Sequence, residues 1–166
     1  MIVATIPDFE DWYRTQHPRL LSAMTLLAGS LDEAAEATDE ALARAMLRWD
    51  TVGAMVSPGG WVYRVALNVL RRRARRAAIE RRRLHAQPPV APIALPEAHE
   101  EIWAAVRDLP SRQRAAIVLR YVADLTESEI AKATGVSRST VSATLIAARR
   151  RLETQLRLEP QEVDGG

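Results

Sequence analysis

The sequence predicts an all-α protein made of two small helical domains, and three observations support this. No segment of the 166 residues alternates polar and apolar side chains as a half-buried strand does. Several segments instead repeat apolar residues three and four positions apart, the spacing of one buried helix face. Residues 87–96 hold four prolines, so they cannot continue a helix and are expected to form an extended linker. We place the domains at 1–84 and 98–158 and the proline-rich linker at 85–97.

The first domain is expected to hold three helices. The first runs from Asp8 to Ala28 and ends at the Gly-Ser pair 29–30. The second spans 31–49, with one apolar seam and five acids opposite it. The seam consists of Leu31, Ala35, Thr38, Leu42, Ala45 and Trp49, and the acids are Asp32, Glu33, Glu36, Asp39 and Glu40. A loop rich in glycine, serine and proline follows at 50–60, and the third helix runs from about Trp61 to Leu84.

The second domain is expected to hold four helices, near 97–108, 111–123, 126–134 and 137–156. The last two carry the most informative pattern in the chain. Thr126 and Glu129 have the spacing of a capping box, and Gly135 stands where a helix must end with positive φ. Ser137 is then the N-cap of the final helix. A short helix, a glycine turn and a second helix at this spacing predict a DNA-reading helix-turn-helix.

The final helix has one buried stripe and one free face. The stripe consists of Val141, Leu145, Ala148 and Leu152, and the free face carries Arg138, Ser139, Thr140, Ser142, Ala143 and Arg150. Such a helix can lie in the major groove with its N-terminal turns on base edges. A plain helical hairpin within an all-α core is the alternative. The turn, the caps and the stripe all agree with the helix-turn-helix, which favours that interpretation.

Arginine supplies every basic residue except Lys132, and nine arginines fall between 64 and 83 against one acid, Glu80. On a helical period Arg64, Asn68, Arg71 and Arg75 share one narrow face, with Val62, Val65, Ala66 and Val69 on another. Guanidinium groups bind phosphate bidentately, and an asparagine can pair with adenine. A solvated charged helix is the alternative to nucleic-acid binding. Trp61 suits either the core or base stacking, and the core is the favoured interpretation.

The composition also excludes several kinds of site. The chain has no cysteine, so disulfides and thiolate metal sites are absent, and its three histidines have no ligand spacing. No phosphate-binding glycine loop and no nucleophile–base pattern occurs, so we expect no enzyme activity and no cofactor. The longest apolar run is too short to span a bilayer, and acids rather than bases stand near the N-terminus. We therefore expect a cytoplasmic protein with no membrane insertion.

Three passages of the chain resemble the extracytoplasmic-function (ECF) sigma factors, subunits that direct bacterial RNA polymerase to promoters. Residues 33–45 resemble the polymerase-docking helix of region 2, and residues 60–73 resemble its promoter-melting helix. Residues 108–121, followed by the helix-turn-helix, resemble region 4. The resemblance covers about residues 8–157. Each passage is moderately specific, and their order and separation together are strongly specific.

The resemblance implies roles and partners for particular residues. The polymerase-docking residues would be Glu36, Asp39, Glu40 and Arg44, on the β′ clamp, while region 4 would rest on the β flap. The −10 element would be bound by Trp61, Arg64, Asn68, Arg71, Arg72 and Arg75, with loop 50–60 holding a flipped base. The face of the final helix described above would read the −35 element. An anti-sigma factor is a further expected partner. Solubility alone is the alternative role of the acidic face.

The final helix departs from the family because Ser142, Thr144 and Ala147 replace residues that are usually basic. Fewer phosphate contacts predict weak −35 binding with a shallow salt dependence. A free-standing operator-binding regulator is the second hypothesis for the whole chain. It predicts symmetric sites and binding without polymerase. In such a regulator only the C-terminal helix-turn-helix would bind DNA, and the N-terminal domain would be a sensor. A sensor would not need the arginine ladder, the face formed by Arg64, Asn68, Arg71 and Arg75, so this face favours the sigma factor.

Overall fold

The computed structural model describes residues 8–84 and 100–158, and every regular element in these ranges is an α-helix. The all-α prediction is confirmed. The elements are α1 (Phe9–Ala28), α2 (Leu31–Met46), α3 (Trp49–Val52), α4 (Pro58–Leu84), α5 (Glu100–Arg107), α6 (Ser111–Tyr121), α7 (Glu127–Thr134) and α8 (Arg138–Leu158). The predicted linker at 85–97 and the tail after 158 lie outside the described residues.

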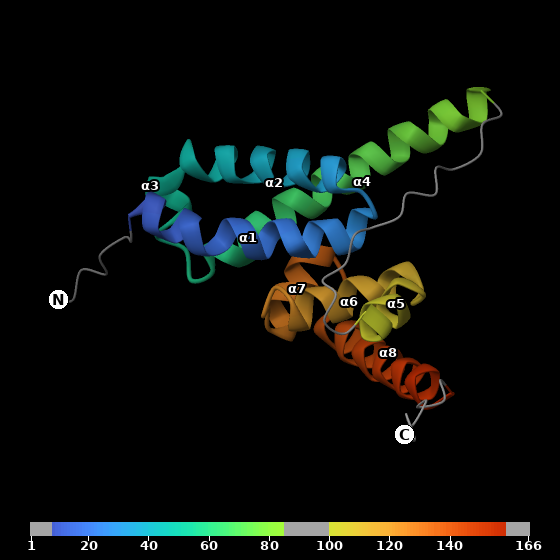
Figure 1. The fold of residues 1–166 in the computed structure, drawn as a ribbon. Helices are drawn as coiled ribbons and strands as arrows, with labels where there is room; N and C mark the ends of the chain where they lie inside the picture. The colour runs from blue at the N-terminus through green and yellow to red at the C-terminus, as the bar shows by residue number, and fades with distance from the viewer. Residues whose placement is uncertain (1–7, 85–99, 159–166) are drawn as a thin grey trace, which may run out of the picture.

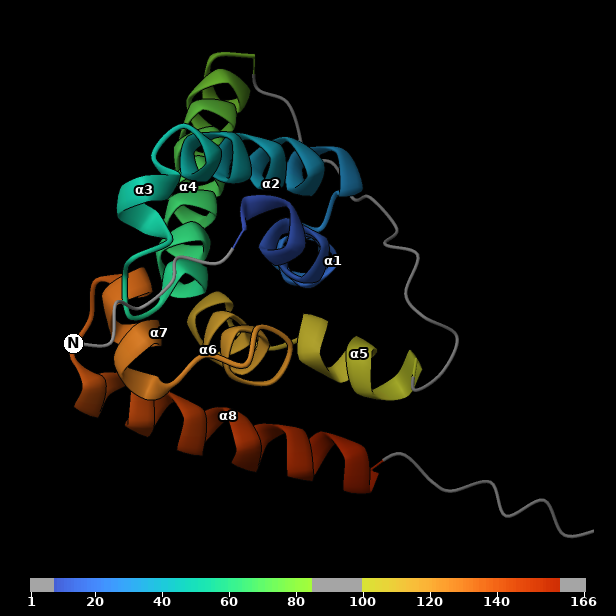
Figure 2. The same cartoon turned by 90° about the vertical axis from the view of Figure 1, so that its left-hand side faces the viewer.

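The helices form two units that pack against each other. Helices α1 to α4 make the first unit and α5 to α8 the second, with α8 on the outer side of the second unit (Figure 1). Helix α4 packs on α7 and α1 packs on α6, so the hydrophobic core continues from one unit into the other (Figure 2). The C-terminal part of α4 projects beyond the bundle (Figure 1).

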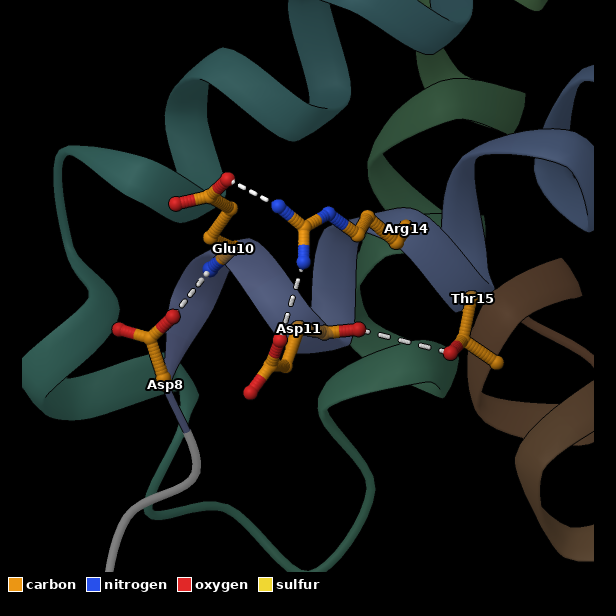
Figure 3. Close-up of polar contacts among 5 residues, drawn as sticks. All are labelled: Asp8, Glu10, Asp11, Arg14 and Thr15. Carbon is orange, nitrogen blue, oxygen red and sulfur yellow. Dashed lines mark hydrogen bonds and ion pairs between the residues drawn. The ribbon is translucent and has the colours of Figure 1, made fainter.

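The start of α1 follows from its first residues. Asp8 is the N-cap and accepts a hydrogen bond from the backbone N–H of Glu10 at 3.1 Å. Arg14 pairs with Glu10 at 2.5 Å and with Asp11 at 3.4 Å, and Thr15 donates to the Asp11 carbonyl (Figure 3). Acids in the first turn also complement the helix dipole. These exposed pairs fix the helix start and contribute little stability.

The predicted seam of α2 is wrong at its N-terminal end, and the helix is shorter than expected. Leu31 is 61% exposed, and the helix ends at Met46 rather than at Trp49. The buried side chains are instead Ala34, Ala37, Thr38, Ala41, Leu42 and Ala45. A seam of small residues lets α1 and α4 approach α2 closely. Packing against two helices therefore selects the alanine-rich stripe over the one that begins with the larger leucine.

Helix α4 begins at Pro58, three residues earlier than predicted, and part of the expected loop is helical. Proline is favoured at the first position of a helix because its missing N–H needs no partner there. Ser57 is the residue before it, and its hydroxyl accepts from the Gly60 N–H at 3.0 Å. Residues 49–52 form the short helix α3, so only residues 53–57 connect α3 to α4.

All four tryptophans are partly buried and pack against the core. At one end of the first unit, the ring of Trp49 lies 4.7 Å from that of Trp12 and 5.2 Å from that of Phe9. Such pairs add about 0.5–1.5 kcal/mol beyond area burial. The aromatic cluster therefore fastens α3 to the start of α1.

Candidate nucleic-acid interface

One face of α4 carries the predicted ladder of arginines around an asparagine. Arg64, Asn68, Arg71 and Arg75 are exposed, while Val62, Ala66 and Val69 are buried. Tyr63 and Leu67 are buried as well, because α4 packs on α1, α2 and α7 at once. In the described part of the chain, no ion pair involves Arg64, Arg71 or Arg75. Their guanidinium groups are available to phosphates.

Arg72 and its neighbour Arg73 have a different environment. Arg72 Nη2 lies 3.0 Å from Glu40 Oε1, and Arg44 pairs with the same carboxylate. Arg73 pairs with Glu36. The fold thus joins residues that the sequence assigned to two separate surfaces, one for DNA and one for polymerase. Asp39 is exposed and lies on the same helix as the two glutamates.

Residues 53–57, which connect α3 to α4, directly precede the helix that carries the arginine ladder. Val56 in this connection is fully exposed, and Met55 is 37% exposed. Trp61, one turn into α4, is half-buried and contacts the core, which supports its interpretation as a core residue. The connection therefore offers exposed apolar side chains just before the start of α4.

The helix-turn-helix forms as its sequence predicts. Thr126 Oγ1 accepts from the Glu129 N–H at 3.3 Å, and the Glu129 carboxylate accepts from the Thr126 N–H at 2.7 Å. Gly135 ends α7 with φ of 77°. Ser137 caps α8 by accepting from the Thr140 N–H at 3.1 Å. Val141, Leu145 and Ala148, the first three members of the predicted stripe, are buried, and Leu152 is half-buried.

The opposite face of α8 is mostly free. Arg138, Ser139, Thr140, Ala143 and Arg150 are exposed, and Ser142 is half-buried. Arg138 lies 3.6 Å from Glu127 on α7, so its charge is partly compensated. The cations on this face are Arg138 and Arg150, and weak phosphate binding stays a prediction.

A groove of about 680 Å³ separates the arginine ladder from the helix-turn-helix. Arg71 lines it from α4, and Thr140 and Thr144 line it from α8. Arg112, at the start of α6, lines this groove and a second hollow beside Ser139 and Ala143. The sequence pattern did not assign Arg112 to the interface. Only the folded unit brings this residue next to α8, so no local pattern could have identified it.

Metal-binding and membrane-spanning features are both missing from the residues that the structure describes. No group of three or more histidine, cysteine, aspartate or glutamate side chains could hold a metal ion there. None of the described helices is both long and apolar enough to span a bilayer.

Known proteins resemble this chain in both units. Residues 12–79 match the family model of Sigma-70 region 2, and residues 99–152 match that of Sigma-70, region 4. The RNA polymerase sigma-E factor of Streptomyces coelicolor is 28% identical over 152 residues, covering 90% of this chain and 86% of that protein. The sigma-E factor of Streptomyces antibioticus is 27% identical over 167 residues, covering 99% and 92%.

Solved structures share the fold. The sigma factor RpoE, in complex with the anti-sigma factor NepR from Bartonella quintana, superposes with a TM-score of 0.77 and 19% identity. That comparison covers 92% of this chain and 99% of RpoE. CnrH, in complex with the cytosolic domain of CnrY, gives a TM-score of 0.59 at 19% identity, covering 92% and 89%.

Two packed helical units, one with an arginine-faced helix and one with a helix-turn-helix, define a promoter-recognition subunit of the sigma-70 type. With regions 2 and 4 matched in order and sigma-E factors as relatives, the chain belongs to the ECF sigma factor family. It is a sigma initiation subunit, and a free-standing operator-binding regulator is not favoured.

Proposed function

We propose that α4 binds and helps to melt the −10 element while α8 reads the −35 element. On α4, the contacts come from Arg64, Asn68, Arg71 and Arg75, with Trp61 and the 53–57 connection beside the unpaired base. On α8, they come from Arg138, Ser139, Thr140, Ser142, Ala143 and Arg150. The observation that carries this proposal is the ladder of guanidinium groups around Asn68 on the exposed face of α4, which has no acidic partner among the described residues. Phosphates fix the register, and the amide supplies base recognition.

We assign Arg72 a supporting role in this interface. Its guanidinium group is held by Glu40 on α2, so a phosphate would have to displace that carboxylate. Both side chains remain partly exposed, so the pair is weak enough to exchange partners. Arg72 therefore orients α4 relative to α2 and contributes less to phosphate binding than Arg71.

We propose that the acidic face of α2 docks on the β′ clamp of core polymerase. Asp39 is exposed without an ion pair in the described residues, and Glu36 and Glu40 each present a carboxylate beside an arginine. Arg44 completes the patch through its pair with Glu40. Docking of α2 there leaves the arginine face of α4 free for DNA. We further propose that the second unit, region 4, rests on the β flap of core polymerase.

Three broader proposals follow from membership of the family. The two solved relatives are described in complexes with anti-sigma factors or a partner's cytosolic domain, so we propose an anti-sigma partner here. A polymerase subunit acts where polymerase is, so we place the protein in the cytoplasm. Its role is binding, without an enzymatic reaction of its own. A pull-down that recovers only polymerase would contradict the anti-sigma proposal.

Transcription with purified core polymerase and a library of promoters tests the main proposal. The protein should select a set of start sites that core alone does not use, and Asn68→Ala should change the −10 sequences recovered. Thr15→Ala, an exposed position on α1, serves as the matched control and should leave the set unchanged. Polymerase-independent protection of symmetric DNA sites, with no start-site selection, would contradict the proposal.

A further inference from the structure

In addition to the shared hydrophobic core, one carboxylate forms a hydrogen bond between the two units. Glu129, in the capping box of α7, accepts a hydrogen bond from the hydroxyl of Ser57, 72 residues earlier in the chain. The other carboxylate oxygen accepts from the backbone N–H and the hydroxyl of Thr126 at 2.7 and 2.8 Å. Ser57 in turn caps α4 through the Gly60 N–H. The start of α4 and the start of α7 therefore share one hydrogen-bonded junction.

This junction is closely packed. A Cβ atom on Gly60 would lie 2.8 Å from Ser57 Oγ and 3.6 Å from Glu129 Cγ, so only glycine fits without a shift. Burial raises the pKa of Glu129, but hydrogen bonds from Ser57 and Thr126 outweigh it and hold the pKa below its ordinary value. The carboxylate is thus ionised at neutral pH, and its hydrogen bonds are charge-assisted.

The junction lies at the end of the connection proposed to hold the flipped base. Ser57 is the last residue before α4, and region 4 occupies its hydroxyl in this arrangement. Further along α4, Arg71 lines the same groove as Thr140 and Thr144 of α8. A duplex that contacts Arg71 would therefore meet α8 at this groove. The packed arrangement of the two units therefore restricts the access of DNA to the Arg71 end of the α4 face.

We propose that the Ser57–Glu129 pair is a latch that holds the free subunit closed and must break before both promoter elements are bound. This rests on the DNA-facing roles proposed above, but the latch itself is a property of the isolated chain. A charge-assisted hydrogen bond at a partly exposed site shifts such an equilibrium by about fivefold to tenfold. The closed form is then favoured yet easily opened by core polymerase.

Two substitutions at Ser57 separate the latch from the helix cap. Asparagine and aspartate both replace serine well as an N-cap. Ser57→Asn keeps an N–H donor for Glu129, whereas Ser57→Asp places a second carboxylate against it. The first variant should keep the closed population, and the second should shift the equilibrium toward the open form. Both should keep the helical circular-dichroism signal of the unsubstituted chain, which verifies that the cap survives.

Because the chain has no cysteine, spin labels can be attached to introduced cysteines without first replacing native ones. Asp32 on α2 and Glu153 on α8 are exposed, lie in different units and are suitable labelling positions as Asp32→Cys with Glu153→Cys. Pulsed electron paramagnetic resonance on the full chain should give one short distance between the two labels when residue 57 is serine and in Ser57→Asn. Ser57→Asp should raise the long-distance population about fivefold or more. An unchanged distribution in Ser57→Asp would overturn the latch.

Association with core polymerase tests the inhibitory consequence separately. If opening limits docking, Ser57→Asp should bind core about fivefold faster than Ser57→Asn. Equal association rates for variants that differ in distance distribution would overturn the inhibitory role. Should the chain fail to direct transcription at all, the distance measurement still decides whether the latch exists, so the two failures are distinguishable.

Discussion

Neighbouring arginines on α4 should differ sharply in their contribution to promoter binding. Arg71 is exposed and has no ion pair in the described residues, whereas Arg72 lies 3.0 Å from a carboxylate oxygen of Glu40. A phosphate contact from Arg71 releases counterions, but one from Arg72 must first displace Glu40. The matched substitutions Arg71→Ala and Arg72→Ala remove the same group from adjacent positions.

The expected size of the difference follows from counterion release. Each phosphate contact contributes about 0.7–0.9 to the slope of log affinity against log salt. Over a fourfold rise in salt, from roughly 50 to 200 mM, one contact therefore accounts for about a 2.5-fold to 3.5-fold loss of affinity. Between these two salt concentrations the affinity of Arg71→Ala should therefore fall by a factor about 2.5 to 3.5 times smaller than that of the unsubstituted protein. Arg72→Ala should follow the unsubstituted slope closely.

Fluorescence anisotropy of a labelled promoter fork, titrated with polymerase carrying each variant, measures both slopes. The unsubstituted holoenzyme and Thr15→Ala serve as controls, because Thr15 lies on α1 and its hydroxyl donates to the Asp11 carbonyl of the same helix. A slope reduction by Arg72→Ala as large as that by Arg71→Ala would refute the reasoning. It would mean that the Glu40 pair does not restrain Arg72 in the complex.

Two further predictions concern stability. Gly135 has φ of 77°, and no described atom outside its immediate neighbours lies within 4 Å of the place an alanine Cβ would take, so Gly135→Ala should cost about 1 kcal/mol from backbone conformation alone. Gly135→Asn should cost less in the same urea titration, and a loss above about 3 kcal/mol for alanine would contradict this. Tyr63 is buried with no hydrogen-bond partner for its hydroxyl in the described residues, so Tyr63→Phe should be neutral or stabilising by about 1 kcal/mol. Burial raises the pKa of Tyr63, and Arg19 only partly offsets this effect. Above about pH 10 the tyrosine therefore ionises more readily in the unfolded chain than in the folded one, so the free energy of unfolding is unaffected below that pH and falls above it. Tyr63→Phe should lack that decline, and an equal alkaline loss in both proteins would show that the tyrosine is not its source.

Local sequence patterns determined the elements that depend on a few neighbouring residues. The capping box at Thr126, the turn at Gly135 and the buried stripe of α8 each involve residues within one or two helical turns. The exposed ladder of α4 was likewise set by a helical period. Cap geometry and helix period act over short range, so the sequence alone was enough to predict them.

Tertiary packing decided what the sequence could not. Leu31 is exposed because α2 presents its alanine stripe to two neighbours, and a periodic pattern does not say which of two adjacent stripes will be covered. Arg72 pairs with Glu40, and Ser57 with Glu129, although 32 and 72 residues separate them. Such partners meet only after the units pack, since ion pairs and hydrogen bonds depend on distance in space and leave no trace in local spacing.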